Sequence, residues 1–172
     1  MDQFVIETER LFLCKLNDSH ANGFFELNND EAVIRFTGDE PFESIRAAEM
    51  FLKNYNQYSL YGYGRWAVHL KSNHEFIGWC GLKYNEDIDS TDIGFRLFKV
   101  YWNKGFATEA AMACISYGFD QLKLKRIIGR VVKANIASIK VLEKCGLHFI
   151  EDYNFHGMPG SVYEITNVSN QI

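Results

Sequence analysis

Hydrophobic and polar residues alternate along the start of the chain in the manner of a β-strand. Residues 10–16 read Arg-Leu-Phe-Leu-Cys-Lys-Leu, and the pair Asp18-Ser19 that follows is typical of a helix start. Beyond it, apolar residues recur at helical spacing, which predicts helices over residues 19–29 and 45–55. The first third of the chain is therefore expected to fold as a strand followed by helices.

The rest of the chain is predicted to be strand-rich at first and then to alternate strand with helix. Polar turns separate three strands, at residues 65–70, 75–84 and 91–100. Helices are predicted at 105–122 and 136–145, with strands at 126–132, 147–155 and 161–166. This order favours an α/β (α+β) fold with a mixed central sheet and helices packed on it. No repeat or linker divides the chain, so residues 1–172 are expected to form a single domain.

Composition supports a globular protein and disfavours two classes of partner. The chain is 47% hydrophobic and 23% charged with two prolines, which is unlike a disordered chain. A net charge of -4 argues against a protein that neutralises nucleic-acid phosphates, so no nucleic acid is expected. The N-terminus lacks a signal-peptide pattern and no 18-residue apolar run occurs, which predicts a cytoplasmic protein with no membrane partner.

The cysteines carry no pattern of chemistry. They are widely spaced, without a C-x-x-C pair and without a sequence cluster with the five histidines. The positions are Cys14, Cys80, Cys114 and Cys145. We expect four reduced thiols and no metal.

The most informative segment joins the strand that contains Asp92 to a helix that starts at Gly105. Unpaired N–H groups at a helix start carry the positive end of the helix dipole and can hold a pyrophosphate. Gly105 and Ala107 are small enough to let phosphate oxygens approach the backbone, and Lys104 adds a positive charge. The plainer interpretation is an ordinary strand-to-helix connection. No Walker or dinucleotide-binding motif is present.

Three ordered motifs in the chain resemble the GNAT N-acetyltransferase superfamily. Gly105 and Ala107 match the small positions of its Gln/Arg-x-x-Gly-x-Gly/Ala signature, while Trp102 stands at the Gln/Arg position. That departure is familiar in the branch resembling ribosomal-protein N-terminal (alanine) acetyltransferases. The Thr-Glu-Arg-Leu run at residues 8–11 and the segment 135–146 fit that branch too. The resemblance implies a mostly antiparallel sheet of about seven strands flanked by about four helices.

The same resemblance implies acetyl-CoA as the co-substrate and assigns residues to it. The pantetheine arm is expected between the ends of two splayed strands, where Phe95 and Leu97 meet it through backbone groups. The pyrophosphate is expected on the backbone of Asn103, Lys104, Gly105, Phe106, Ala107 and Thr108. Asn135 and Ser138 match coenzyme-binding positions, although Asn135 is also a good helix cap.

Acetyl transfer also requires proton handling. An amine attacks a thioester only in its neutral form, so a proton must be removed. Asp92 stands where this branch has an acidic residue and is a candidate base; the alternative is that it pairs with Arg96. Many GNAT enzymes use a tyrosine to protonate the thiolate, but Leu142 occupies that position here, and Ser138 is the nearest hydroxyl.

These features favour an N-acetyltransferase acting by direct attack in a ternary complex, since no cysteine matches the thioester site. The leading acceptor is a protein N-terminal α-amine. A small amine such as an amino sugar, antibiotic or polyamine is the alternative, and a non-catalytic acyl-CoA-binding module is a third hypothesis. The sequence is compatible with a monomer or a homodimer.

Overall fold

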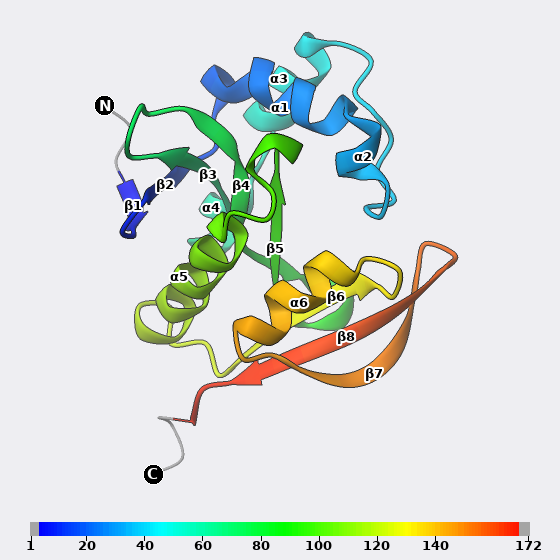
Figure 1. Cartoon of the computed structure of the whole chain (residues 1–172). Helices are drawn as coiled ribbons and strands as arrows, with labels where there is room; N and C mark the ends of the chain where they lie inside the picture. The colour runs from blue at the N-terminus through cyan, green and yellow to red at the C-terminus, as the bar shows by residue number, and fades with distance from the viewer. Residues whose placement is uncertain (1–3, 169–172) are drawn as a thin grey trace.

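The structure, a computed structural model, describes residues 4–168. Its strands form one eight-stranded sheet in the order β1-β2-β3-β4-β5-β6-β8-β7 (Figure 1). They are β1 (Phe4–Glu7), β2 (Leu11–Lys15), β3 (Arg65–Leu70), β4 (Phe76–Asn85), β5 (Ser90–Leu97), β6 (Arg126–Val132), β7 (His148–Phe155) and β8 (Met158–Thr166). Each neighbouring pair is antiparallel except β5 with β6, which is parallel.

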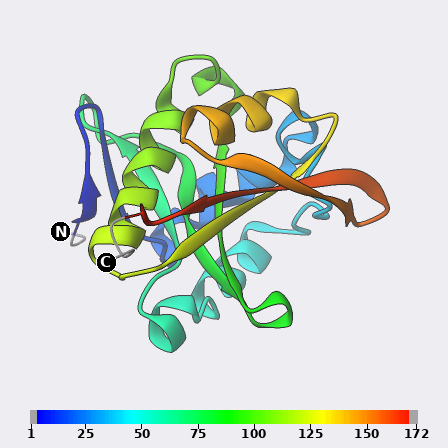
Figure 2. The ribbon, with the colours of Figure 1, turned by 90° about the horizontal axis from the view of Figure 1, so that it is seen from below.

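Helices cover both faces of this sheet. The α-helices of the described residues are α1 (Ala21–Asn29), α2 (Glu31–Ile34), α3 (Ile45–Lys53), α4 (Gln57–Tyr61), α5 (Phe106–Asp120) and α6 (Ile136–Lys144). Short 3-10 turns add η1 (Asp18–His20), η2 (Glu86–Ile88) and η3 (Lys99–Tyr101). Figure 2 shows α5 and α6 together on one side of the sheet, with the N-terminal helices on the other.

Side-chain alternation along β2 explains why both faces are covered. Leu11 and Leu13 belong to the large core that also contains the inner face of α5. Cys14 points the other way and joins a second core with Phe24 of α1 and Leu52 of α3. Because successive residues of a strand face opposite sides, a strand with apolar residues at nearly every position needs a helix layer on each face.

The predicted architecture is confirmed, with differences at the edges. The sheet has eight strands rather than about seven, because residues 4–7 form an unpredicted edge strand paired with β2. The strand predicted at 91–100 ends at Leu97, and the hydrogen bond from Tyr101 N–H to the Phe98 carbonyl, 2.9 Å long, starts the η3 turn. The short helix α4 was also unpredicted; it ends at Gly62, whose φ of 81° suits glycine.

Among the helices of residues 4–168, not one is both long enough and apolar enough to cross a bilayer. All four cysteines are buried, and among residues 4–168 none of them forms a disulfide.

Candidate active site

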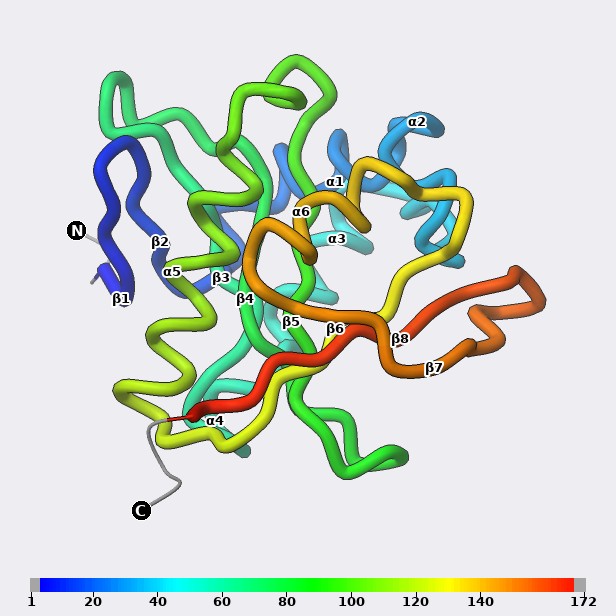
Figure 3. Tube along the Cα trace, turned by 60° about the horizontal axis from the view of Figure 1, so that its bottom comes forward, coloured from blue at the N-terminus to red at the C-terminus, as the bar shows by residue number. Residues whose placement is uncertain are grey.

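A fork between β5 and β6 is the main irregularity of the sheet. These parallel strands share a single register pair, Asp92 with Ile128, whereas β5 is paired with β4 along the whole length of β5. Beyond that point the strands part, and Figure 3 shows them leaving it in different directions. The sheet therefore contains an opening whose two sides are the carboxyl-terminal halves of β5 and β6.

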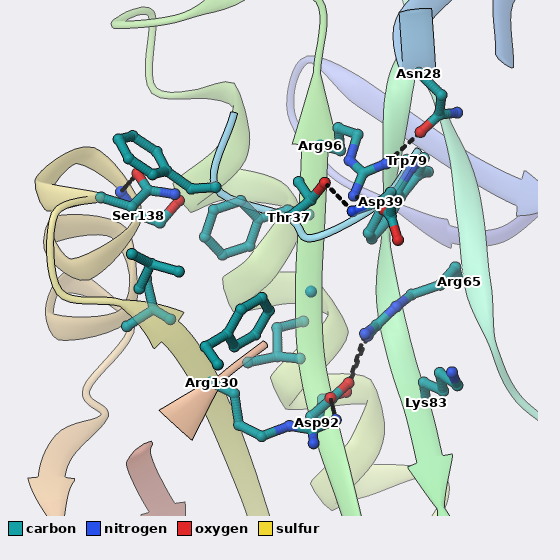
Figure 4. Close-up of a pocket in the computed structure, with 18 of the residues that line it drawn as sticks. Asn28, Thr37, Asp39, Arg65, Trp79, Lys83, Asp92, Arg96, Arg130 and Ser138 are labelled. Carbon is teal, nitrogen blue, oxygen red and sulfur yellow. Dashed lines mark hydrogen bonds and ion pairs between the residues drawn. The ribbon is translucent and has the colours of Figure 1, made fainter. Parts of the chain in front are cut away.

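A cavity of about 500 Å³ lies along this fork (Figure 4). Its walls include Phe95 of β5, Val132 of β6, and Asn135 and Ser138 at the start of α6. The connection between α2 and α3 covers part of it through residues 36–42. Such a volume lies within the usual range for small-molecule sites.

An ion-pair triad stands at the vertex of the fork. Asp92 on β5 accepts a hydrogen bond from Arg65 Nη2 of β3 at 2.5 Å and another from Arg130 Nη2 of β6 at 2.9 Å. Each carboxylate oxygen has one arginine partner. Arg96 is not part of this triad, because it contacts Asp39 at 2.6 Å instead, so the alternative pairing of Asp92 with Arg96 is not formed.

The triad sets the charge of Asp92. Burial by itself raises the pKa of this carboxyl, but Arg65 and Arg130 lower it more, and the net pKa lies below its ordinary value. Asp92 therefore stays ionised at neutral pH and is a weak proton acceptor. This property favours a fixed negative charge at the vertex over direct general-base action.

The backbone of β5 faces the fork at alternate residues. Phe98 N–H, just after β5, donates to the Ile77 carbonyl of β4 at 3.0 Å. The backbone N–H and C=O groups of the even-numbered residues of β5 therefore point toward β4. Phe95 and Leu97 consequently turn their polar backbone groups toward the opening. The Leu97 carbonyl already accepts a bond from Trp102 Nε1 at 2.8 Å, which leaves Phe95 with the better-exposed pair of groups.

Helix α5 starts beside the fork without a side-chain cap. Its N-cap residue is Gly105, whose φ of 81° is unfavourable for other residues, and no side chain accepts from the first-turn N–H groups. Ala107 in that turn is small, and Lys104 precedes it. These are the features that the sequence predicts for a pyrophosphate cradle; occupancy by a pyrophosphate stays a prediction.

The N-terminal Thr-Glu-Arg-Leu motif is hydrogen-bonded to the start of α5. Glu109 accepts hydrogen bonds from Thr8 Oγ1 at 2.6 Å, from Arg10 N–H at 2.9 Å and from Arg10 Nε at 2.6 Å. Arg10 Nη1 also donates to the Lys104 carbonyl at 3.0 Å, and its guanidinium lies 4.3 Å from the centre of the Phe106 ring. Two motifs far apart in sequence thus fix one turn.

The start of α6 forms the other side of the cavity. Asn135 caps this helix, accepting from Ser138 N–H at 3.2 Å, so its capping role is confirmed; coenzyme contact stays a prediction. Within residues 4–168 the Ser138 hydroxyl has no hydrogen-bond partner. Leu142 is buried and packs so closely on Gly129 that an added Cβ there would lie 2.7 Å from its Cδ2.

Several lining residues were absent from the sequence-based prediction. Arg65 and Arg130 complete the triad, Lys83 is an exposed residue at the rim of the same cavity, and the buried Nε1 of Trp79 has no hydrogen-bond partner among the described residues. Lys83 could have been expected opposite Asp92 had the strand register been known, because the two residues are paired across β4 and β5. Arg65 and Arg130 carry no local sequence signal.

A forked sheet beside an uncapped helix start is the arrangement that the sequence motifs predict for a coenzyme-dependent acyltransferase. An acetyltransferase (GNAT) domain model matches residues 10–148, and the chain belongs to the GNAT acetyltransferase family. An uncharacterized N-acetyltransferase p20 from Bacillus licheniformis is 34% identical over 137 residues, covering 78% of this chain and 77% of its own. The family uses acetyl-CoA.

Solved structures agree on the fold. A GNAT-family acetyltransferase from Bacillus anthracis has a TM-score of 0.81 and 25% identity, covering 95% of this chain and 98% of its own. Spermidine N-acetyltransferase from Vibrio cholerae, in complex with CoA and spermine, has a TM-score of 0.77 and 22% identity, covering 92% and 96%. A similarity at 22% identity supports the same fold and says nothing about the substrate of this chain.

We predict that Arg10→Ala weakens acetyl-CoA binding several-fold, equivalent to about 1 kcal/mol, because the turn before α5 loses its tie to the Lys104 carbonyl. Calorimetry on the folded protein measures this. The matched control is Arg126→Ala: Arg126 is also half-exposed and ion-paired, to Glu164, but lies at the start of β6. Equal affinities for the two variants would remove Arg10 from coenzyme positioning.

Asp92→Asn is expected to lower the free energy of unfolding by about 3 kcal/mol at neutral pH, because two largely buried guanidinium groups lose their anion. The lowered pKa of Asp92 means that the wild-type advantage is present above the unfolded-state pKa of about 4 and is lost as pH falls through the lower folded-state value. Denaturant unfolding at pH 7 and below pH 4 measures both limits.

The control for this variant is Asp87→Asn, which removes an exposed carboxylate in η2 and should change stability by less than about 0.5 kcal/mol. A comparable loss in both variants, or a loss for Asp92→Asn that does not shrink in acid, would contradict the triad as a stabilising element.

Proposed function

We propose that this GNAT acetyltransferase transfers the acetyl group directly to a protein N-terminal α-amine. The proposal for the coenzyme rests on the fork beside the uncapped start of α5, which together offer a slot for an extended arm and N–H groups for phosphates. The N-terminal acceptor is supported by the motif resemblance to the ribosomal-protein acetyltransferase branch and by the charge of the cavity.

Charge at the vertex favours a singly charged acceptor over a polycation. Asp92 is matched by Arg65 and Arg130, and Lys83, an exposed residue that also lines the cavity, has no ion pair among residues 4–168. The charged residues that line the cavity, four cationic and three acidic, leave a net positive charge, which disfavours a polyamine. A peptide N-terminus presents one amine beside carbonyl oxygens, which can accept hydrogen bonds from such cations.

The cysteines support direct attack in a ternary complex. Burial raises the pKa of Cys145 to about 12 and holds that of Cys114 well above its ordinary value. Thiols of this kind are poor nucleophiles near neutral pH. The amine itself then attacks the thioester carbon, the tetrahedral intermediate loses the amine proton to solvent, and coenzyme A leaves as the thiolate.

Ser138 and Asp92 have separate roles in this proposal. The Ser138 hydroxyl, which lines the cavity and has no protein partner, donates a hydrogen bond to the departing thiolate in place of the usual tyrosine. Asp92, held ionised by Arg65 and Arg130, keeps the two guanidinium groups in place at the vertex, where they can donate hydrogen bonds to the carbonyl oxygens of the acceptor. A small amine remains the second candidate acceptor because the cavity volume suits one.

An acceptor panel tests this function. Thiol release from acetyl-CoA should be fastest with short unblocked peptides, slow with spermidine and amino sugars, and absent with the same peptides acetylated at the N-terminus. The rate should rise with pH and level off above a pH of about 8, which is the pKa range of an α-amine. Asp92 should add no inflection in the neutral range, because its pKa is lowered.

If spermidine were turned over faster than any peptide, with a pH–rate inflection at about 10, the N-terminal acceptor would be rejected. The acetyltransferase activity itself would still stand. Tight acetyl-CoA binding without thiol release for any amine would instead indicate a binding module. Ping-pong kinetics would exclude direct transfer.

Ser138→Ala is predicted to lower kcat at least about tenfold while changing coenzyme affinity little, because stabilisation of the departing thiolate by a hydrogen bond belongs to the chemical step. Ser138→Thr is the matched variant; it retains a hydroxyl and should keep most of the activity. Steady-state kinetics with calorimetry separates the two effects. Loss of coenzyme affinity in Ser138→Ala with kcat unchanged would assign Ser138 to binding alone.

A further inference from the structure

A cysteine and two histidines lie close together where β2, β3 and η1 meet, away from the fork. Cys14 lies on β2, His20 in η1 and His69 on β3. One ligand atom from each, the Cys14 sulfur and one ring nitrogen from each histidine, lies within 4.8 Å of the other two. Nothing in the spacing of these residues along the sequence indicates such a cluster.

The distance between the histidines matches a shared metal ion. The two Nε2 atoms face each other at 3.2 Å. Two nitrogen ligands at about 2.0–2.1 Å from a tetrahedral Zn²⁺ lie about 3.3–3.4 Å apart. One thiolate and two imidazoles are also a donor set that zinc accepts, with one position left open.

The remaining ring nitrogens have the partners that metal-binding histidines need. His69 Nδ1 lies 3.0 Å from the His74 carbonyl oxygen, and His20 Nδ1 lies 3.3 Å from the Asn17 carbonyl oxygen. A ring that donates from Nδ1 to a carbonyl presents a lone pair at Nε2, which is the ligating tautomer. A cation between the rings would bind both lone pairs; without one, Nε2 of one ring carries the proton and donates to Nε2 of the other.

The surroundings limit solvent access while keeping one route open. Cys14 and His20 are buried, whereas His69 is half-buried. The Phe12 ring stacks on the His69 ring at 4.9 Å, and Phe76 lies 5.3 Å from the His20 ring. An apolar shell of this kind strengthens a charge-bearing site by excluding water.

We propose that Cys14, His20 and His69 bind one Zn²⁺ ion, with the fourth coordination position left to solvent. Binding releases the thiol proton of Cys14 to solvent and replaces a weak polar contact with three bonds. The ion ties β2, η1 and β3 together at the point where the chain enters α1. It acts on stability rather than on acetyl transfer, because β4 separates β3 from β5, a spacing of about 10 Å.

Cobalt titration of the chelator-treated full chain tests the site. Co²⁺ should bind with a stoichiometry of about one per chain, give a thiolate charge-transfer band in the near ultraviolet and intense visible bands of tetrahedral geometry, and be displaced by Zn²⁺. Zn²⁺ should also raise Tm. Cys14→Ser should abolish the charge-transfer band, and His69→Ala should weaken Co²⁺ binding at least about tenfold.

The matched controls are Cys145→Ser and His148→Ala, which remove the same side-chain types elsewhere and should bind Co²⁺ like the wild type. Because His69→Ala changes a half-buried residue, it keeps the test valid if Cys14→Ser fails to fold. The site is overturned if folded wild type binds neither ion, or if Co²⁺ binds equally well to His69→Ala. A proton bridge from His20 Nε2 to His69, with His20 Nδ1 accepting from Asn17 N–H at 3.2 Å, would then explain the geometry.

Discussion

The structure depends on the ion-pair triad at the vertex of the fork. Beyond the pair of Asp92 with Ile128, no further register pair joins β5 to β6, so the two halves of the sheet need another tie at that point. Arg65 reaches Asp92 from β3, and Arg130 reaches it from β6. Both arginines are largely buried, so these charge-assisted bonds are little screened by solvent. The triad thus holds the sheet together where the cavity requires it to open.

A second constraint fixes the helix that faces the opening. An uncapped helix start offers N–H donors only if the preceding turn keeps one conformation, and glycine at position 105 makes that turn permissive. Arg10 fixes the conformation of this turn, because it donates to the Lys104 carbonyl and is itself held by Glu109. Burial raises the pKa of Glu109, but its bonds to Thr8 and Arg10 outweigh this and leave it lowered, which keeps the carboxylate charged. Flexibility and anchoring are therefore supplied by different residues.

The sequence predicted most elements of the fold because their patterns are local. The helix starting after Gly105 and the one capped by Asn135 each have a start or stop signal within a few residues. Strand β1 was missed because four residues show too little alternation to predict a strand. Its pairing with β2 is a tertiary contact that no local pattern indicates. The candidate coenzyme residues came from motifs, whereas Arg65 was not foreseen, because no pattern marks a residue whose partner lies 27 positions away.

The replacement of the usual tyrosine by Leu142 has a consequence for the geometry of α6. A leucine at that position buries its side chain against Gly129 of β6, where even a methyl group would clash. This contact brings α6 onto the strand and directs the first turn of the helix, with Ser138, along the cavity wall. Because residues four apart lie on one helix face, Ser138 lines the same cavity as Leu142, one turn farther from the vertex and toward the open end of the fork. In the proposed mechanism the Ser138 hydroxyl donates a hydrogen bond to the departing thiolate from this wall of the cavity, so the missing phenol need not mean missing chemistry.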